Sequence, residues 1–303
     1  MENRNSMTDT SKRKKLSDNV KSSIFLSPAW ILLLVFFLTP MVLTIIFSFT
    51  NLALTGAQAQ NLRFIGFDNF IKMFNDVNLY NSIAKTLIFV LFSAILGQCF
   101  LGFLIAFLMK GKNATFRRII GIAVIAAWVT PEVVVAFSWV AFLGDSGTLN
   151  SIITSISDIE AIAFLFEYPM VSVVVANIWR GTAFSMMAFQ TALDDIPVEV
   201  EEAAIMDGAT RWKIVWNITI PMVKGTITTN LMLVTLQTLG VFTLIYTMTG
   251  GGPGNDTMTL PVYMYQQAFV SYQLGYGTAI SLIILTIGAI FSILYMKFLK
   301  VKV

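Results

Sequence analysis

The sequence predicts an all-α membrane protein with six transmembrane helices and with both termini in the cytoplasm. Of its 303 residues, 56% are hydrophobic and 12% are charged, whereas soluble proteins carry about 25% charged residues. The apolar residues gather in segments of about 20 residues or more, long enough to cross about 30 Å of hydrocarbon. A soluble fold could not bury that much apolar surface, so we expect a lipid bilayer to surround the chain.

Six apolar segments follow one another along the chain. The first has no cleavage-site pattern behind it and is longer than the 7–15 apolar residues of a signal peptide, so we expect it to remain as an anchor. The predicted spans lie at about residues 24–49, 82–109, 119–143, 170–193, 225–248 and 278–299. They form one transmembrane domain over residues 23–303, preceded by a basic cytoplasmic tail over residues 1–22.

The basic residues predict the orientation. Sixteen of the twenty Lys and Arg residues lie in the N-terminal tail, in the loops after the second and fourth spans, and at the C-terminus. The positive-inside rule places these segments in the cytoplasm. The tail is best interpreted as an orientation signal near anionic lipid rather than as a specific partner site. We expect no nucleic-acid partner.

Several kinds of chemistry are absent from the sequence. It contains no histidine, which excludes histidine-dependent metal sites and the Ser-His-Asp and Cys-His catalytic systems. The single cysteine, Cys99, lies within the second span and is expected to pack as a small hydrophobe. The glycine run Gly250–Gly254 lacks the lysine of a phosphate-binding loop. We therefore expect no catalytic residue, metal or bound cofactor in this chain.

A soluble-looking helix-turn-helix lies between the fourth and fifth spans. Pro197 after two aspartates predicts a helix start, so a first helix should cover about residues 197–206. Gly208 supplies a left-handed stop, and Thr210 should cap a second helix that runs to Pro221. The alternative is an interfacial amphipathic helix, but such helices favour Lys and Arg whereas this one is acidic. The element is therefore interpreted as a docking element for a partner outside the bilayer.

Sequence motifs in this order resemble a known family. EAAIMDGATRWKIVWNITIP, over residues 202–221, resembles the EAA loop of ABC importer permeases, in which a short helix docks into a groove on the ATPase subunit. Four further segments are similar to carbohydrate-importer permeases of the maltose and multiple-sugar type, on the MalF side of the pair: FIGFDNFIKMF (64–74), WRGTAFSMMAFQTALDDIP (179–197), TGGGPGNDTMTLPVYMYQQAF (249–269) and LGYGTAIS (274–281). The resemblance covers nearly all of the chain from the first span onward.

The resemblance implies the permease subunit of an ATP-driven importer in the bacterial cytoplasmic membrane. An extracellular sugar-binding protein or lipoprotein would deliver a sugar or oligosaccharide to a cavity shared with a second, related permease subunit. Two ATPase subunits would bind ATP and Mg and drive transport. The extra N-terminal spans and large periplasmic domain of the maltose protein are missing, so docking of the binding protein is expected on the outer loops 50–80, 144–169 and 249–277.

The resemblance also assigns candidate residues. Those that would couple to the ATPase are Glu202, Ala203, Ala204, Met206, Asp207, Gly208 and Ala209. Glu202 would form a cap or a salt link there, or else only complement the helix dipole. The family's sugar-contacting positions fall at Gly181, Gln237, Thr238 and Val241, and the residue types themselves add Glu132, Arg180 and Phe242 to the candidate substrate path. Gly181 would admit a sugar ring close to the backbone, and Trp139 is a second possible stacking face beside Phe242.

Polar side chains within the spans also have structural interpretations. Gln237 and Thr238 suit sugar hydroxyls, but interhelical hydrogen bonding is the common role of such residues in membranes. Glu132 and Arg180 are expected at the same depth, roughly 15 Å from the outer surface at 1.5 Å per residue. They would therefore pair, either as a strut between the third and fourth spans or as sugar ligands.

Two other classes of protein remain as alternatives. An ion-coupled secondary sugar transporter would favour an inverted repeat and broken helices at matching positions, and the sequence indicates neither. A membrane sensor scaffold would not need polar groups at mid-span depth.

Overall fold

The computed structural model describes residues 25–157 and 159–298, which are mostly helical. Within these residues the only extended pairing is an antiparallel bridge between Thr50 and Phe64. Segments labelled η are π-helical. The elements are η1 (Leu34–Leu38), α2 (Thr39–Ser48), α3 (Gly56–Gln60), α4 (Asp68–Phe74), α5 (Val77–Phe89), η2 (Val90–Cys99), α6 (Phe100–Met109), α7 (Ala114–Val129), α8 (Glu132–Leu143), α9 (Thr148–Ile156), α10 (Phe164–Glu167), α11 (Pro169–Asp194), α12 (Val198–Met206), α13 (Arg211–Ile214), η3 (Val215–Thr219), α14 (Ile220–Leu239), α15 (Thr243–Thr249), α16 (Leu260–Tyr265), η4 (Gln266–Val270) and α17 (Leu274–Phe298).

The all-α membrane class is confirmed. Among the described residues, five helices are long and apolar enough to cross a membrane: Phe25–Ser48, Val77–Met109, Glu132–Ile156, Pro169–Asp194 and Leu274–Lys297. A sixth span results if Arg211–Leu239 and Thr243–Thr249 are taken together. The predicted basic tail, residues 1–22, lies outside the described residues.

The third span differs from the prediction of one helix over residues 119–143. α7 ends at Val129, Thr130 is extended with ψ at 131°, and α8 begins at Glu132. Pro131 explains the break, because it lacks an N–H donor and disfavours the helical conformation of the residue before it. Glu132 therefore lies in the first turn of a new helix rather than in the middle of a continuous one.

The fifth span also differs from the prediction. A separate cytoplasmic helix ending at Pro221 was expected, but α13, η3 and α14 run on as one helix from Arg211 to Leu239. Pro221 removes one backbone donor. The π-helical turn over Val215–Thr219 precedes it, and the Ile220 N–H bonds the Val215 carbonyl there. The helix bends by 47° after Leu239 instead.

These two interruptions show that the expectation of unbroken helices was wrong. The segments that follow the breaks, α8 and α15, pack against each other. Val135 and Ala136 of α8 share one buried apolar cluster with Leu244 and Ile245 of α15. The breaks are therefore part of the packed core.

α11 is the central helix, and it packs on η2, α6, α7 and α14. Small residues on the neighbouring helix allow this close approach. A Cβ atom added at Gly97 would lie 2.3 Å from Cγ1 of Ile178, and one at Gly102 would lie 2.4 Å from Cβ of Ser185. Neither position can accept a larger side chain without a shift of α11.

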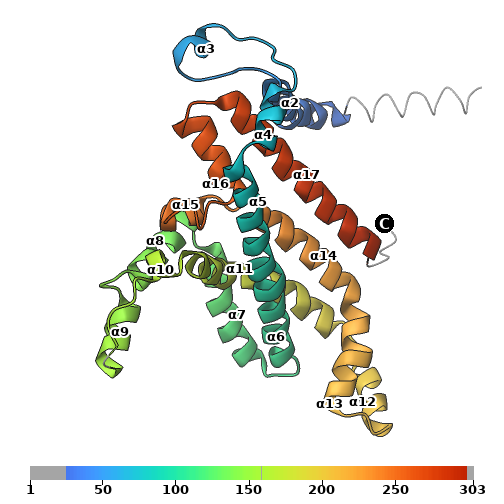
Figure 1. Ribbon diagram of the computed structural model, residues 1–303. Helices are drawn as coiled ribbons and strands as arrows, with labels where there is room; N and C mark the ends of the chain where they lie inside the picture. The colour runs from blue at the N-terminus through green and yellow to red at the C-terminus, as the bar shows by residue number, and fades with distance from the viewer. Residues whose placement is uncertain (1–24, 158, 299–303) are drawn as a thin grey trace, which may run out of the picture.

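The elements of interest lie at two ends of the molecule (Figure 1). α12 and α13 lie at the end shown at the bottom, which we call the α12 end, and α3 and α4 lie at the opposite end, which we call the α4 end. At the α4 end, the Leu54 N–H bonds the Tyr272 carbonyl at 2.9 Å and the Gly275 N–H bonds the Leu52 carbonyl at 2.8 Å. The predicted outer loops 50–80 and 249–277, which are far apart in sequence, therefore lie in contact.

Candidate functional site

The turn at the α12 end follows the sequence closely. α12 begins after Pro197, within one residue of the predicted start, and ends at Met206. Gly208 has a φ of +77°, which confirms the predicted left-handed stop. The Ala209 N–H then bonds the Ala204 carbonyl at 3.0 Å. Thr210 occupies the N-cap position of α13, although its side chain makes no capping hydrogen bond.

One ion pair connects this element to the membrane helices, and a second links two membrane helices next to it. Lys110, between α6 and α7, pairs with Glu201 of α12, and Arg117 of α7 pairs with Asp194 at the end of α11. The Lys110 and Glu201 side chains are 19% and 29% exposed, so the pair is partly shielded from water. Sequence reasoning had offered Glu202 for a salt link, but Glu202 is exposed and the neighbouring Glu201 forms it.

Large apolar side chains remain uncovered at the α12 end. Met206 is 86% exposed, Trp212 74% and Ile205 60%. Ala203 is also exposed, whereas Ala204 faces inward and is 9% exposed. Exposed apolar surface of this kind marks an interaction site. We call Ala203, Ile205, Met206 and Trp212 the α12 surface.

The predicted substrate positions on the fifth span lie beside its break. Gln237 is exposed, whereas the adjacent Thr238 is buried at 3% exposure. Val241 and Phe242 lie in the break itself and are partly buried. Of the two polar side chains, Gln237 is therefore the one that can meet a ligand in this conformation.

Phe242 belongs to a row of aromatic rings that sequence reasoning missed. Ring centroids lie 5.1 Å apart for Phe242 and Tyr246, 4.8 Å for Phe242 and Tyr265, and 5.4 Å for Tyr265 and Phe269. Tyr246 and Phe269 are 39% and 49% exposed. We call these four residues the aromatic row. The spacing of four between 242 and 246, and again between 265 and 269, was the available sequence signal.

Glu132 and Arg180 do not form the predicted ion pair. The ion pairs among the described residues are Lys85–Asp256, Lys110–Glu201 and Arg117–Asp194. Oε1 of Glu132 and Nε of Arg180 are instead buried without a hydrogen-bond partner. Residues 132–143 and 170–180, which the depth estimate counted, are each helical in the structure, so a shared depth was not sufficient to bring the two side chains together.

The space beside Gly181 holds another side chain. A Cβ atom at Gly181 would lie 2.3 Å from Cδ of Gln98, so the glycine makes room for this amide. Gln98 Nε2 donates to the Asn177 carbonyl at 3.1 Å, and Asn177 Nδ2 donates to Ser93 Oγ at 2.6 Å. A sugar approaching Gly181 would therefore meet Gln98, which the sequence did not single out.

Trp139, the second predicted stacking face, packs within the protein. Its ring lies 6.1 Å from that of Trp179 and 5.7 Å from that of Phe142, both edge to face. It also contacts the buried apolar cluster shared by α8 and α15. In this conformation Trp139 offers less free ring surface than the aromatic row.

Asp76 joins several elements at the α4 end. Its Oδ1 accepts from the backbone N–H groups of Asn78 and Leu79, and its Oδ2 accepts from the hydroxyls of Tyr263 and Tyr276. Burial alone would raise the pKa of Asp76, but these four hydrogen bonds outweigh it and lower the pKa. Burial lowers the pKa of the neighbouring Lys72, although Asp76 opposes that shift.

Residues 98–299 match the family described as "Binding-protein-dependent transport system inner membrane component". The chain belongs to this family. It is therefore a multi-pass membrane component of an ABC importer, and the prediction of a transport subunit rather than an enzyme is confirmed. The ion-coupled secondary transporter and the sensor scaffold are excluded.

Relatives of this importer component span almost its whole length. The multiple sugar-binding transport system permease protein of Streptococcus mutans is 32% identical over 286 residues, 91% of this chain and 94% of that protein. The sulfoquinovosyl glycerol transport system permease protein of Agrobacterium fabrum is 28% identical over 293 residues, 95% of this chain and 92% of that protein. A chain of a bacterial ABC transporter that imports alginate has a TM-score of 0.80 at 23% identity, covering 94% of this chain and 98% of that chain, and has the same fold.

Proposed function

We propose that this permease imports a sugar or oligosaccharide that an extracellular binding protein or lipoprotein delivers. It works in the bacterial cytoplasmic membrane with a second, related permease subunit and two ATPase subunits, and both of its termini lie in the cytoplasm. The observation that carries the proposal is α12, which the Lys110–Glu201 ion pair holds to the membrane helices while its apolar side chains stay uncovered. The sugar substrate is supported by the multiple-sugar relative named above.

In this proposal the α12 surface docks on an ATPase subunit, and no cofactor binds to this chain. ATP and Mg bind to the ATPase subunits. The Lys110–Glu201 pair would carry movement of the docked helix to α6, and the Arg117–Asp194 pair would couple α7 to α11. The coupling residues are those predicted from the sequence, Glu202, Ala203, Ala204, Met206, Asp207, Gly208 and Ala209, together with Glu201.

The substrate path would pass the break in the fifth span. Aromatic faces stack on the apolar faces of sugar rings, and the aromatic row offers four rings, of which Phe242 lies in the break that follows Gln237. The Gln237 amide can donate to and accept from hydroxyls. Buried polar groups without partners are costly, so the free atoms of Glu132 and Arg180 are natural partners for sugar hydroxyls. The remaining predicted positions, Gly181, Thr238 and Val241, would shape the path rather than grip the sugar.

The binding protein would dock at the α4 end. The loops 50–80 and 249–277 are tied there by backbone hydrogen bonds, and the loop 249–277 is also held to α5 by the Lys85–Asp256 ion pair at 2.8 Å. The Lys72 ammonium also donates to Gln273 Oε1 at 2.6 Å. Loops held together in this way would present one joined surface.

Reconstituted vesicles test the proposal. The permease pair with its ATPase subunits should import radiolabelled oligosaccharide only when ATP and the loaded binding protein are supplied from the correct sides. Uptake driven by an ion gradient without ATP would contradict it. Orientation has its own test in a Cys99→Ser background: cysteine at position 213 should react with an impermeant maleimide only from inside, and cysteine at position 256 only from outside.

A further inference from the structure

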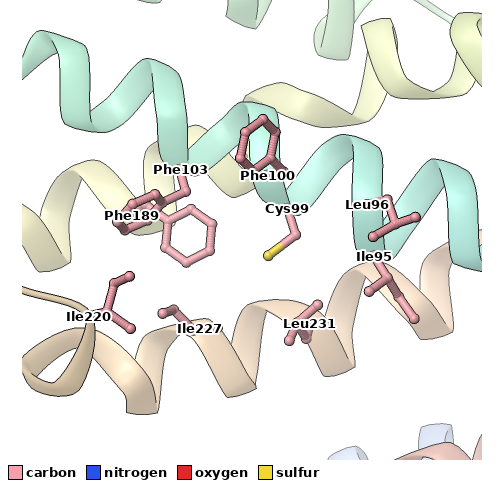
Figure 2. Close-up of a pocket in the computed structure, with 9 residues that line it drawn as sticks. All are labelled: Ile95, Leu96, Cys99, Phe100, Phe103, Phe189, Ile220, Ile227 and Leu231. Atoms are coloured by element: carbon pink, nitrogen blue, oxygen red, sulfur yellow. The ribbon is translucent and has the colours of Figure 1, made fainter. Parts of the chain in front are cut away.

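A cavity of about 530 Å³ lies between two membrane helices, apart from the substrate path described above. Figure 2 shows its walls, with the η2 and α6 side chains on one side, those of α14 on the other, and the Cys99 sulfur directed toward α14. Its nine lining residues are Ile95, Leu96, Cys99, Phe100, Phe103, Phe189, Ile220, Ile227 and Leu231. Every lining side chain is hydrocarbon or thiol.

This lining selects the chemistry of the occupant. The volume falls in the range of about 300–1,000 Å³ that is typical of ligand sites. No side chain of the lining can pair with a sugar hydroxyl, and burying a hydroxyl without a partner costs free energy. The cavity therefore fits a hydrocarbon chain and not the transported substrate.

A lysine lies on the same stripe of α14 as the cavity wall. Ile220, Lys224, Ile227 and Leu231 are spaced by four, three and four residues, which places them on one helical face. Lys224 is exposed and takes part in none of the ion pairs among the described residues. Helical side chains tilt toward the N-terminus of their helix, which is the α12 end for α14. The ammonium can thus extend toward the end of the cavity that Ile220 lines, one helical turn nearer the α12 end.

A transmembrane helix of a partner subunit could lay only one face against this space and could not enter it completely. The α14 residues that line the cavity span 11 residues, or roughly 16 Å at 1.5 Å per residue. A helix of that length and about 10–12 Å wide would fill roughly 1,300 Å³ or more, against the 530 Å³ available. An extended hydrocarbon chain is far thinner.

We propose that the cavity binds an acyl chain of an anionic phospholipid whose phosphate pairs with Lys224. The apolar wall of the cavity contacts the acyl chain, and the Lys224 ammonium favours a negatively charged headgroup. This proposal requires that the protein lies in a bilayer, and it does not depend on which substrate the protein transports.

Photocrosslinking in the complete transporter tests this site. The transporter is placed in nanodiscs of phosphatidylcholine. Each nanodisc preparation contains a trace of one probe lipid, either phosphatidylglycerol or phosphatidylcholine, that carries a diazirine on its acyl chain. Crosslinks should map to residues 95–103 and 220–231, with phosphatidylglycerol favoured about fivefold, as expected for one lysine at a membrane surface. Lys224→Gln should remove the preference, whereas the matched change Lys112→Gln, at another exposed lysine, should leave it unchanged.

A second variant tests the cavity itself. Ile227→Trp should fill the space and remove the crosslinks of both lipids, while co-purification of the other subunits checks assembly. Equal crosslinking of the two lipids in the unaltered transporter, or a preference that survives Lys224→Gln, would overturn the proposal. So would a crosslink from Cys99 to a partner subunit, because the occupant would then be protein.

Discussion

Lys110 and Glu201 are 91 positions apart in the chain, yet their side chains form an ion pair that fixes α12 to the connection between α6 and α7. Exposed ion pairs contribute only about 0.2–1 kcal/mol, and this one is partly buried. The Lys110–Glu201 pair matters for its position more than for its contribution to stability. Because α12 forms no other ion pair with the membrane helices within the described residues, the pair is the main polar link through which movement of α12 can reach α6.

Neutralising Glu201 should therefore loosen coupling. We expect Glu201→Gln to lower ATP-driven sugar uptake about fivefold, the equivalent of about 1 kcal/mol for one ion pair. The complex should still assemble, which co-purification of the ATPase checks. Glu199→Gln is the matched control, because Glu199 is exposed in the same first turn and forms no ion pair among the described residues. Exchange of the two charges, Lys110→Glu with Glu201→Lys, should restore part of the uptake, and equal effects at 199 and 201 would show that the pair carries no coupling.

Substitution of Gly208 should affect the protein through backbone strain alone. Its φ is +77°, and a Cβ atom there would meet nothing within 4 Å, so strain is the only cost of a side chain. Gly208→Ala should cost about 1 kcal/mol and reduce uptake, while the affinity of the binding protein for sugar should not change. Gly225→Ala is the control, since Gly225 also has open space but lies inside α14, where alanine is favoured by about 1 kcal/mol. Equal uptake in the two variants would mean that the turn tolerates strain.

Asp76 should make stability depend on pH. Its pKa is lowered in the folded protein, so its contribution is present above the unfolded pKa near 3.8 and is lost as the pH falls through the folded value. Asp76→Asn keeps a good helix cap but weakens the bonds from the two tyrosines, and should cost about 1–2 kcal/mol at pH 7. Melting temperatures in detergent should differ at pH 7 and converge below pH 4. Asp68→Asn, at an exposed aspartate in α4, is the matched control and should leave the melting temperature at pH 7 unchanged.

Local features of this fold were predictable from sequence, and its bends and cross-chain contacts were not. Gly208 and Pro197 determine the ends of α12 through their own backbone restrictions, which is why that helix was predicted within one residue. The break at Pro131 was missed because apolar periodicity continues on both sides of it. The Glu201–Lys110 pair and the contact of Phe242 with Tyr265 depend on how distant helices pack, and single-chain patterns contain no record of that packing.

Gln237 and Thr238 provide a matched test of the substrate path. Gln237 is exposed beside the break, so Gln237→Ala should leave the complex stable and lower transport about tenfold, as expected for one lost hydrogen bond to a sugar. Thr238 is buried, so Thr238→Ala should mainly lower the melting temperature. The measurements are uptake in vesicles and thermal stability in detergent. A stability loss at Gln237 with normal specific transport would make it a structural residue.

Glu132 and Arg180 test whether buried polar atoms without partners serve the substrate. Had the two residues formed a strut, exchanging them would preserve it, but Oε1 of Glu132 and Nε of Arg180 find no partner in this conformation. We therefore expect Glu132→Gln and Arg180→Gln to assemble normally and to lose transport about tenfold, with no rescue by the exchange Glu132→Arg with Arg180→Glu. Glu167→Gln, at an exposed glutamate of α10, serves as the control for charge. Yield and co-purification report assembly, and vesicle uptake reports transport. Poor assembly of both single variants together with recovery in the exchanged one would instead establish a strut that forms in another conformation of the transport cycle.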